Sequence, residues 1–290
     1  MNAIADIDLK AVRQRMKSVA QVVRLPLRSG QWSGVNGSVF GQGTGSSLDF
    51  QDQRPYVPGD DPRHINWQAY ARNGSYTMKL YRQEVSPRVD LLLDVSPSMF
   101  LNEAKAQRVW ELAYFAVESA LQLGASLKVY AVGRTSHEVP LEHVLGGAWS
   151  LTEDGGMNEG PQLGLVPLRA RALRVLISDL LFPSAPELFT TPLTTNRGRG
   201  ILLAPCCAAE ADPDWAGNID FEDVETAHHE KRRVPTATRE RYLLAYRRHF
   251  ELWREPCLRQ GIAMARVSAE ADFVQALRAE AAKTGAVEMV

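Results

Sequence analysis

The sequence predicts an α/β fold: a mainly parallel sheet with helices on both faces, preceded by an N-terminal helix and a small β-containing extension. Short apolar runs alternate with helical segments from residue 89 onward. The first run, Val89-Asp90-Leu91-Leu92-Leu93, is typical of a strand buried on both faces of a parallel sheet. The chain has 290 residues, of which 45% are apolar, and this is enough for one large core and an appended piece.

The N-terminal segment predicts one helix. Apolar residues recur there at helical spacing from Ile4 to Val23, and Pro26 ends the pattern because proline cannot continue a helix. The following residues, 30–45, are rich in glycine and serine. They lack the preceding strand and following helix of a phosphate-binding loop, so we interpret them as a connecting loop.

Residues 54–74 predict a turn followed by a short helix. Pro58-Gly59 suits the two central positions of a type II turn. Asp61 can cap a helix whose first residue is Pro62, and Asn73-Gly74 is expected to end that helix.

The rest of the chain predicts the strands and helices of the sheet domain. We expect strands at 76–84, 89–93, 127–132, 173–178, 201–203 and 262–267, and helices at 102–123, at 236–260 and around 273–277. Residues 219–234 interrupt the alternation and are compatible with a hairpin. In the helix at 236–260, Tyr242, Tyr246, Phe250 and Trp253 form an aromatic stripe that predicts core packing. The predicted domains are residues 1–88, the helix and extension, and residues 89–290, the α/β domain.

Oxygen-bearing side chains follow the buried run at 89–93. Asp94, Ser96 and Ser98 form an Asp-x-Ser-x-Ser array at the expected carboxyl end of the strand, where ligand sites of open α/β sheets gather. One carboxylate and two hydroxyls on alternate residues can converge on a hard cation such as Mg²⁺, which prefers oxygen ligands. The structural alternative is that both serines cap the following helix while Asp94 accepts hydrogen bonds from their backbone amides.

Composition excludes several classes of function. Lys plus Arg is 33 and Asp plus Glu is 34, so the net charge of -1 favours neither nucleic acid nor a membrane surface. The three cysteines contain no Cys-x-x-Cys pair, which argues for a reducing compartment and against a zinc site. No apolar stretch approaches the roughly 18 residues of a membrane span. We therefore expect a cytoplasmic protein without a membrane span.

Two families resemble this sequence. The Asp94-Val95-Ser96-Pro97-Ser98 array after a buried strand, a long helix next, and Ile177-Ser178-Asp179 at another strand tip resemble a von Willebrand factor A-like (Rossmann-like) domain with its metal-ion-dependent adhesion site. The upstream array is more specific and resembles the bacterial domain of unknown function 58 (DUF58) family. It comprises Arg54, Tyr56, Pro58-Gly59-Asp60, Arg63, Trp67, Ala71-Arg72 and Glu84.

The resemblance implies a metal site. It assigns Asp94, Ser96, Ser98 and Asp179 as ligands of Mg²⁺ or Mn²⁺, together with a threonine from a Gly-Gly-Thr-like loop. The corresponding loop here reads Asp154-Gly155-Gly156-Met157-Asn158, so Met157 stands where the threonine is expected. A thioether is a poor ligand for a hard cation. Asn158 or Thr152 would have to substitute, although neither occupies the matching position.

The upstream array has two interpretations. Arg54, Asp60, Arg63 and Arg72 can form an ion-pair network that fastens the N-terminal piece to the main domain, with Trp67 buried beneath it. Alternatively, these residues form an exposed surface that a partner contacts. The sequence does not separate the two.

The resemblance also implies a function. Members of the family are typically encoded beside MoxR-type AAA+ ATPases and are thought to act with them in chaperone-like assembly or activation of other proteins. A metal held at the strand tips would leave a coordination position for a partner's acidic side chain. This hypothesis makes the chain a non-enzymatic, protein-binding adaptor whose client the sequence does not identify.

The alternative hypothesis is a metal-dependent hydrolase or phosphatase that uses the same Asp/Ser cluster. An aspartate that accepts a phosphoryl group is expected to have a second acid two residues later, but Ser96 occupies that position after Asp94. A serine hydrolase is expected to carry its nucleophile on a Gly-x-Ser-x-Gly elbow, and none surrounds Ser96 or Ser98. The nearest approach to a histidine cluster is His228-His229-Glu230, which we interpret as a surface feature of the hairpin. These features favour the non-enzymatic hypothesis.

Overall fold

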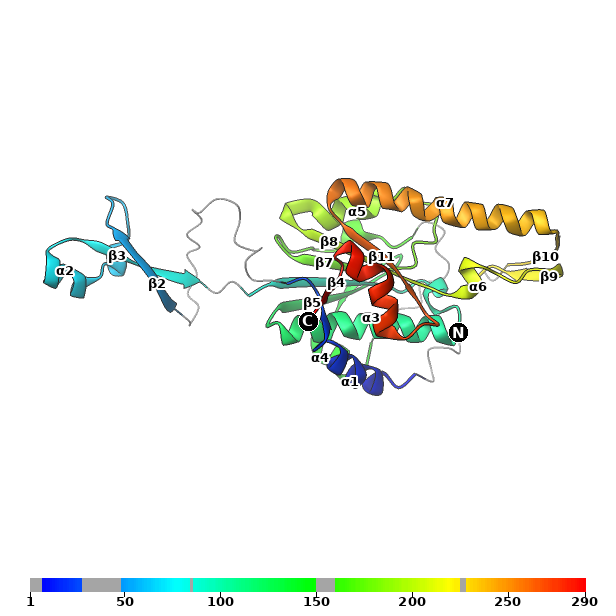
Figure 1. The fold of residues 1–290 in the computed structure, drawn as a ribbon, viewed down its shortest axis with the longest axis horizontal. Coiled ribbons are helices and arrows are strands. Elements are labelled where there is room, and N and C mark those ends of the chain that lie inside the picture. Colours follow the sequence, from blue (N-terminus) through cyan, green and yellow to red (C-terminus); the bar gives the residue numbers. More distant parts are fainter. Residues whose placement is uncertain (1–6, 28–47, 84–85, 150–159, 225–227) are drawn as a thin grey trace. The chain divides into compact units, whose positions relative to one another are not determined.

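A computed structural model describes residues 7–27, 48–83, 86–149, 160–224 and 228–290 (Figure 1). The chain divides into two compact units. The larger unit contains Met1–Ser29 and Pro87–Val290, and the smaller unit contains Gly30–Ser86. The N-terminal helix therefore belongs to the unit that holds the sheet, and the smaller unit holds the β-containing extension.

The larger unit is built around a six-stranded sheet. Its strands are β4 (Arg88–Asp94), β5 (Ser126–Val132), β6 (Ser136–Val139), β7 (Leu173–Ile177), β8 (Arg199–Cys206) and β11 (Ala263–Ser268), and their spatial order is β11-β8-β7-β4-β5-β6. All neighbouring strands are parallel except β6, which is antiparallel to β5. The predicted mainly parallel sheet is confirmed. The order reverses between β4 and β7, so this is a doubly wound sheet with its switch point there.

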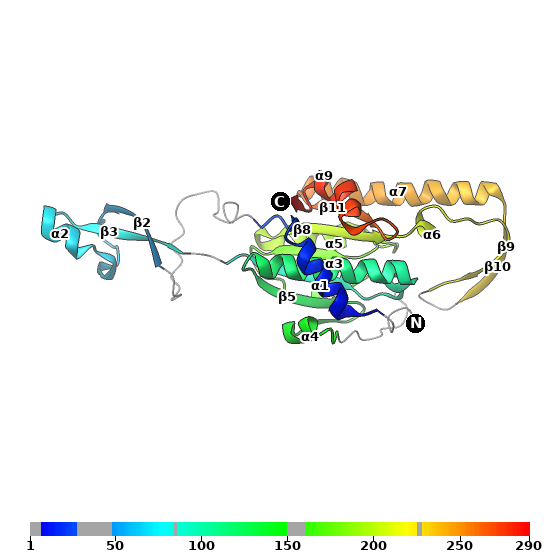
Figure 2. The same ribbon diagram turned by 60° about the horizontal axis from the view of Figure 1, so that its bottom comes forward.

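Helices cover both faces of this sheet (Figures 1 and 2). The helices of the larger unit are α1 (Leu9–Val19), α3 (Glu103–Gln122), α4 (Leu141–Gly146), α5 (Glu187–Thr194), α6 (Ala208–Ala211), α7 (Thr236–Gln260), α8 (Phe273–Ala276) and α9 (Ala282–Thr284), with short turns η3 (Pro97–Phe100), η4 (Leu163–Leu165), η5 (Thr195–Arg197) and the π-helical η6 (Leu277–Ala281). Helix α3 packs on one face, while α5 and α7 pack on the other.

Helix α3 is buried around most of its circumference, although the sequence shows a single apolar stripe. The reason is that α1 covers its outer side. Arg13 Nε donates to Glu118 Oε1 at 2.6 Å, and Ser119 Oγ accepts from the backbone of Leu25 at 2.7 Å. Helix α1 begins at Leu9 because Asp8 caps it, so it is shorter than the apolar pattern from Ile4 suggested.

The aromatic stripe of α7 lies in the core, as predicted. Trp253 is fully buried, and Tyr246 and Phe250 are buried beside it. The Trp253 ring contacts Phe182 and Phe189 with centroid distances of 5.6 and 5.5 Å. The stripe therefore packs α7 against the sheet and against α5.

A predicted hairpin precedes α7. Strands β9 (Gly217–Glu222) and β10 (His229–Val234) pair antiparallel with each other, which confirms the hairpin. Trp215 packs between the hairpin and α7: its ring centroid lies 5.1 Å from that of Phe221 in β9 and 4.6 Å from that of Tyr242 in α7. The hairpin and the start of α7 form an arm at one end of the sheet (Figure 2).

The smaller unit contains β2 (Leu48–Pro55) and β3 (Thr77–Gln83), which pair antiparallel, and the short helices η2 (Pro62–His64) and α2 (Trp67–Asn73). The predicted turn is confirmed: the amide of Asp60 donates to the carbonyl of Val57 at 3.0 Å, and Gly59 has a φ of 106°. Asp61 caps η2 as expected.

One helix was predicted after this turn, and that prediction is wrong. Ile65 adopts an extended conformation and forms a bridge with Met78, which interrupts the helix. Asn66 then caps α2 by accepting from the amide of Ala69 at 3.2 Å. Gly74, in the left-handed conformation, ends α2 as predicted.

Several elements escaped prediction because they are short. They are the edge strand β6, the helices α4, α5 and α6, and the two-residue strands β1 (Val23–Arg24) and β12 (Glu288–Met289), which pair with each other. None of the helices within the described ranges is long and apolar enough to cross a membrane.

Gly198 offers a test of the packing around β7. Its φ of -69° suits any residue, but an added Cβ would lie 2.5 Å from Cζ of the buried Arg174. The Arg174 guanidinium donates hydrogen bonds to Thr195 Oγ1 at 3.1 Å and to the carbonyl of Arg169 at 2.9 Å, and so connects the segments before and after β7. We expect Gly198→Ala to lower the free energy of unfolding by about 1–3 kcal/mol, because overpacking displaces Arg174.

Urea unfolding measures this change, and Gly164→Ala is the control. A Cβ at Gly164 meets nothing within 4 Å, so this variant is expected to change stability by less than about 1 kcal/mol. Equal stabilities of the two variants would contradict the packing of Arg174 against Gly198.

Candidate functional site

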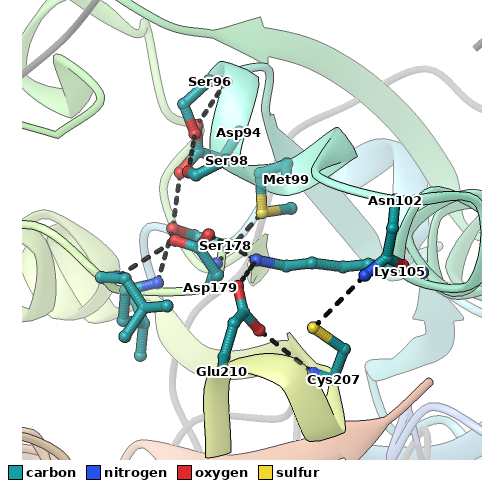
Figure 3. A network of polar contacts seen from close by, with 12 residues as sticks. Asp94, Ser96, Ser98, Met99, Asn102, Lys105, Ser178, Asp179, Cys207 and Glu210 are labelled. Carbon is teal, nitrogen blue, oxygen red and sulfur yellow. Dashed lines mark hydrogen bonds and ion pairs between the residues drawn. The ribbon is translucent and has the colours of Figure 1, made fainter. Parts of the chain in front are cut away.

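The candidate site lies at the carboxyl ends of β4 and β7, where the strand order reverses. The two strands pair in parallel, with Leu93 opposite Ile177. Residues that follow the two strands therefore emerge side by side at the same edge of the sheet. Asp94 ends β4, and Ser178 and Asp179 directly follow β7 (Figure 3). The fold thus brings the two strand tips named from the sequence to one place.

Asp94 is a fully buried carboxylate. Its Oδ1 accepts from the amide of Ser96 at 2.9 Å, and its Oδ2 accepts from Ser178 Oγ at 2.6 Å. Burial, together with the nearby carboxylate of Asp179, raises the pKa of Asp94 to about 7. Asp94 forms no ion pair with any residue in the described ranges. Its charge therefore lacks a counter-ion, which is costly for a buried group.

Ser96 and Ser98 follow Asp94 in the turn that leads to α3. Their hydroxyl oxygens lie 3.2 Å apart, and both side chains are at least partly covered (Figure 3). Ser96 makes no capping hydrogen bond to η3, and α3 is capped by Asn102, which accepts from the amide of Lys105 at 2.9 Å. The alternative in which Ser96 serves as a helix cap is wrong, although Asp94 does accept from the Ser96 amide as that alternative expected.

Asp179 is bound by a lysine that sequence reasoning missed. Lys105 Nζ donates to Asp179 Oδ2 at 2.8 Å and also to Glu210 Oε1, and both the Lys105 and Asp179 side chains are buried (Figure 3). Burial acts to lower the pKa of Lys105, but the carboxylates of Asp179 and Glu210 outweigh it and hold the pKa above its ordinary value. Lys105 is therefore a buried ammonium group.

No local pattern identifies Lys105. It lies in the first turn of α3, amid Glu103, Gln107 and Arg108, where a lysine normally indicates a solvated helix surface. Only the fold places it against two acids from other segments. The spacing of 74 residues to Asp179 and 105 to Glu210 gives no signal in a single sequence.

Glu210 connects the site to the arm. It belongs to α6, where its Oε2 accepts from the amide of Cys207 at 3.1 Å. Its backbone carbonyl accepts from the hydroxyl of Tyr242 in α7 at 2.7 Å. A continuous set of polar contacts thus runs from the tip of β7 through Lys105 to α6 and α7.

The remaining contacts of Asp179 fix its orientation. Its Oδ1 accepts from the amide of Leu181 at 3.0 Å, and its own amide donates to the thioether of the buried Met99 at 3.1 Å. Both carboxylate oxygens accept a hydrogen bond in Asp179 and also in Asp94, but within the described ranges only Asp179 receives one from a charged donor, Lys105.

The donor set suits a hard divalent cation. Asp94 supplies a buried carboxylate without a counter-ion, and the Ser96 and Ser98 hydroxyls lie beside each other on the following turn. Such oxygens are the ligands that Mg²⁺ prefers. Within the described ranges, no three His, Cys, Asp or Glu side chains are grouped to hold a metal, so any cation there depends on the two hydroxyls.

Part of the predicted metal set cannot be placed. Thr152 and the loop from Asp154 to Asn158, including Met157, lie outside the described residues. The assignment of Asp94, Ser96, Ser98 and Asp179 as ligands stays a prediction.

The upstream array contains two ion pairs between residues that are close in sequence. Both Nη atoms of Arg54 donate hydrogen bonds to the carboxylate of Asp60, at 2.8 and 2.7 Å, and this bidentate contact lowers the pKa of Asp60. Arg63 pairs instead with Asp61, at 2.7 Å. Arg72 forms no ion pair with the described part of the chain. The array thus shapes the turn that leads into α2.

The sequence leaves two interpretations of Trp67 open, burial beneath an ion-pair network and exposure on a surface, and the structure shows a residue that is 57% exposed. Among the residues of the smaller unit whose side chains the structure describes, Ile65 and Met78 are the buried apolar ones. Trp67 packs edge-on against Tyr70 and Tyr76, with centroid distances of 6.2 and 6.4 Å.

These rings belong to a group that we call the aromatic face, made of the exposed Trp67, Tyr70 and Tyr76 and the half-buried Tyr56. Tyr70 and Tyr76 are stacked, with centroids 4.5 Å apart, and Tyr56 lies 6.2 Å from Tyr76. Tyr76 is 48% exposed. Tryptophan and tyrosine are the residue types most enriched at the energetic centres of protein interfaces.

The contacts of His228, His229 and His249 place none of these three histidines against the serine hydroxyls at the strand tips. His228 and His229 are exposed on the hairpin, as the sequence indicated. In α7, Nε2 of His249 lies 2.6 Å from the carbonyl oxygen of Leu180 and 3.2 Å from Trp253 Nε1, so it either donates to the carbonyl or accepts from the indole. Neither position provides a partner for the hydroxyl of Ser96 or Ser98.

Comparison with known proteins finds one family. The sequence model of DUF58, described as a protein of unknown function, matches residues 52–144. This segment includes the array from Arg54 to Arg72 and the tip from Asp94 to Ser98, but ends before Asp179 and Glu210. The resemblance to DUF58 is confirmed over these residues. No curated protein and no solved structure matches the chain.

The buried lysine has a measurable effect on stability. Lys105→Met would leave Asp179 and Glu210 buried without their cation, and breaking a buried ion pair in this way costs about 3–5 kcal/mol. We expect chemical denaturation to show a loss of this size. The control is Lys128→Met, which removes an exposed ion pair of 2.7 Å to Glu138 and is expected to cost no more than about 1 kcal/mol. Similar losses in the two variants would contradict the role of Lys105.

Proposed function

We propose that this chain is a non-enzymatic protein-binding adaptor that binds its partner through a divalent cation. In this proposal the larger unit is a von Willebrand factor A-like domain, and Mg²⁺ or Mn²⁺ binds at Asp94, Ser96 and Ser98, with Asp179 nearby. The cation keeps one coordination position for an acidic side chain of the partner. The observation that carries the proposal is the buried, uncompensated carboxylate of Asp94 beside two hydroxyls at the switch point of the sheet.

The chemistry of the donors supports a cation over a neutral ligand. A buried carboxylate without a counter-ion is unfavourable, and a divalent cation would remove that cost. The cation would supply a positive centre with exchangeable water ligands, which a carboxylate from another protein can replace. Asp94, Ser96 and Ser98 are the residues that would hold it.

The proposed partner is a MoxR-type AAA+ ATPase, and the pair would assemble or activate other proteins. The match of residues 52–144 to DUF58 supports this partner through the family resemblance. The aromatic face adds a second surface for contact. Its Trp67, Tyr70 and Tyr76 rings are exposed, and the ion pairs Arg54–Asp60 and Arg63–Asp61 fix the shape of the adjoining turn before any partner binds.

The alternative function is a metal-dependent hydrolase or phosphatase that uses the same Asp/Ser cluster. General-base catalysis would need a base within hydrogen-bond reach of a serine hydroxyl. In the described ranges Ser96 Oγ lies 3.2 Å from the hydroxyl of Ser98, and Nε2 of His249 faces the Leu180 carbonyl and Trp253 Nε1. Turnover of generic phosphate or ester substrates that Ser96→Ala abolishes would favour this alternative.

Cation binding is the first test. We expect calorimetric titration with Mg²⁺ or Mn²⁺ to give binding heat with the wild-type chain and none with Asp94→Asn. The asparagine keeps the shape of the side chain, and its carbonyl can still accept from the Ser96 amide, so the fold is retained while the charge is lost. Asp212→Asn, at an exposed carboxylate of the same charge, is the control and is expected to bind like the wild type. Equal heats for the wild type and Asp94→Asn would remove the site.

Partner binding is the second test. We expect the chain to co-purify with the MoxR-type ATPase encoded near its gene, and EDTA to release the ATPase. Trp67→Ala is expected to weaken this binding at least tenfold while changing stability by less than about 1 kcal/mol, because the ring is largely exposed. Leu188→Ala, at another exposed apolar side chain, is the control. An ATPase that never co-purifies counts against the partner, and full binding by Trp67→Ala counts against the aromatic face.

A further inference from the structure

We infer that Lys105 is a specificity-determining residue of the proposed cation site: its ammonium group withholds Asp179 from the cation, so that tight cation binding requires a carboxylate from the partner. This inference rests on the proposed function and deepens it. The sequence resemblance assigns Asp179 as a ligand, whereas the structure places a buried lysine on that carboxylate.

The contacts of Asp179 leave it poorly available. Its Oδ2 accepts from Lys105 Nζ at 2.8 Å, and its Oδ1 accepts from the amide of Leu181 at 3.0 Å. A divalent cation bound directly to Asp179 would lie next to the ammonium group, and like charges at such a distance repel strongly where water is excluded. Asp94 is then the one carboxylate, among the described residues, that is positioned at the strand tips and lacks a cationic partner.

Lys105 cannot swing away from this position. Its side chain is buried, and its backbone is fixed in the capped first turn of α3 by Asn102. Its second acceptor, Glu210, is itself held by the Cys207 amide at 3.1 Å within the turn that starts α6. The ammonium group is therefore a permanent part of the site.

The charge count explains the expected affinity. Cation affinity of oxygen sites follows the number of charged ligands. With Asp179 withheld, the cation receives one carboxylate and two hydroxyls from this chain, which makes a weak site. A partner's acidic side chain would supply the second charged ligand, so cation and partner would each strengthen the binding of the other.

The test uses a double variant that preserves net charge. Lys105→Met with Glu210→Gln removes one positive and one negative charge together and frees Asp179. The glutamine can still accept from the Cys207 amide through its carbonyl oxygen, which protects the start of α6. We expect this variant to bind Mn²⁺ at least tenfold more tightly than the wild type, measured by calorimetry or by electron paramagnetic resonance of free Mn²⁺ at fixed ionic strength.

Adding Asp179→Asn to the double variant is the matched control. It is expected to abolish the gain, because the gain requires the freed carboxylate. A purely structural role of Lys105 predicts only loss of binding on substitution, so an increase in affinity distinguishes the two. Circular dichroism of each variant checks that it is folded. Should the double variant not fold, Asp179→Asn in the wild-type background gives a second test: it is expected to change Mn²⁺ affinity less than threefold, whereas Asp94→Asn abolishes binding.

The outcomes separate this inference from the proposed function. Wild-type binding of Mn²⁺ without any gain in the double variant overturns the role of Lys105 and leaves the cation site standing. A gain that survives Asp179→Asn also overturns it, because Asp179 is then not the freed ligand. In the wild-type background, a large loss of affinity on Asp179→Asn has the same consequence. Absence of Mn²⁺ binding in every variant overturns both proposals.

Discussion

The parallel pairing of β4 with β7 is the constraint on which the candidate site depends. These two strands lie side by side at the point where the strand order reverses. The connections that leave their carboxyl ends therefore run in opposite directions, and the residues directly after each strand lie next to each other. Asp94 and Ser178 are joined by a hydrogen bond of 2.6 Å across 84 residues of sequence for this reason. A different strand order would separate the same residues and leave a buried carboxylate with no neighbour.

A second consequence of this geometry is that acidic groups accumulate in a buried place. Asp94, Asp179 and Glu210 follow three adjacent strands, β4, β7 and β8, and each would be costly to bury alone. Lys105 compensates two of them from α3, on one face of the sheet, and so joins α3, the tip of β7 and α6. Asp94 is the member that this lysine does not reach. Lys105 therefore compensates the charges of Asp179 at the tip of β7 and of Glu210 in α6, whereas Asp94 at the tip of β4 has no cationic partner among the described residues.

Local signals made most of the larger unit predictable. The buried run at Val89 to Leu93, the capped start of α3 and the aromatic stripe of α7 each depend on residues close in sequence, and each was located within a few positions. The sequence also identified both strand tips of the candidate site. Lys105 and Glu210 could not be predicted, because their pairing depends on which helix covers which strand. Met157 and its loop stay untested, since they lie outside the described residues.

In the smaller unit, features that depend on a few neighbouring residues were predictable, whereas features that depend on the surrounding fold were not. Its turn and caps at Gly59, Asp61 and Gly74 follow from single residues and were predicted correctly. For Trp67 the sequence left burial and exposure both open, because burial depends on how much core surrounds a side chain, and the structure shows that the residue is 57% exposed. This exposure carries a functional argument. A unit that fixes its backbone with bidentate ion pairs and caps, yet leaves a tryptophan and two tyrosines exposed, holds an apolar surface in a set shape. Under the proposed function, a partner that binds such a surface loses little conformational entropy, because the surface is already in shape before binding.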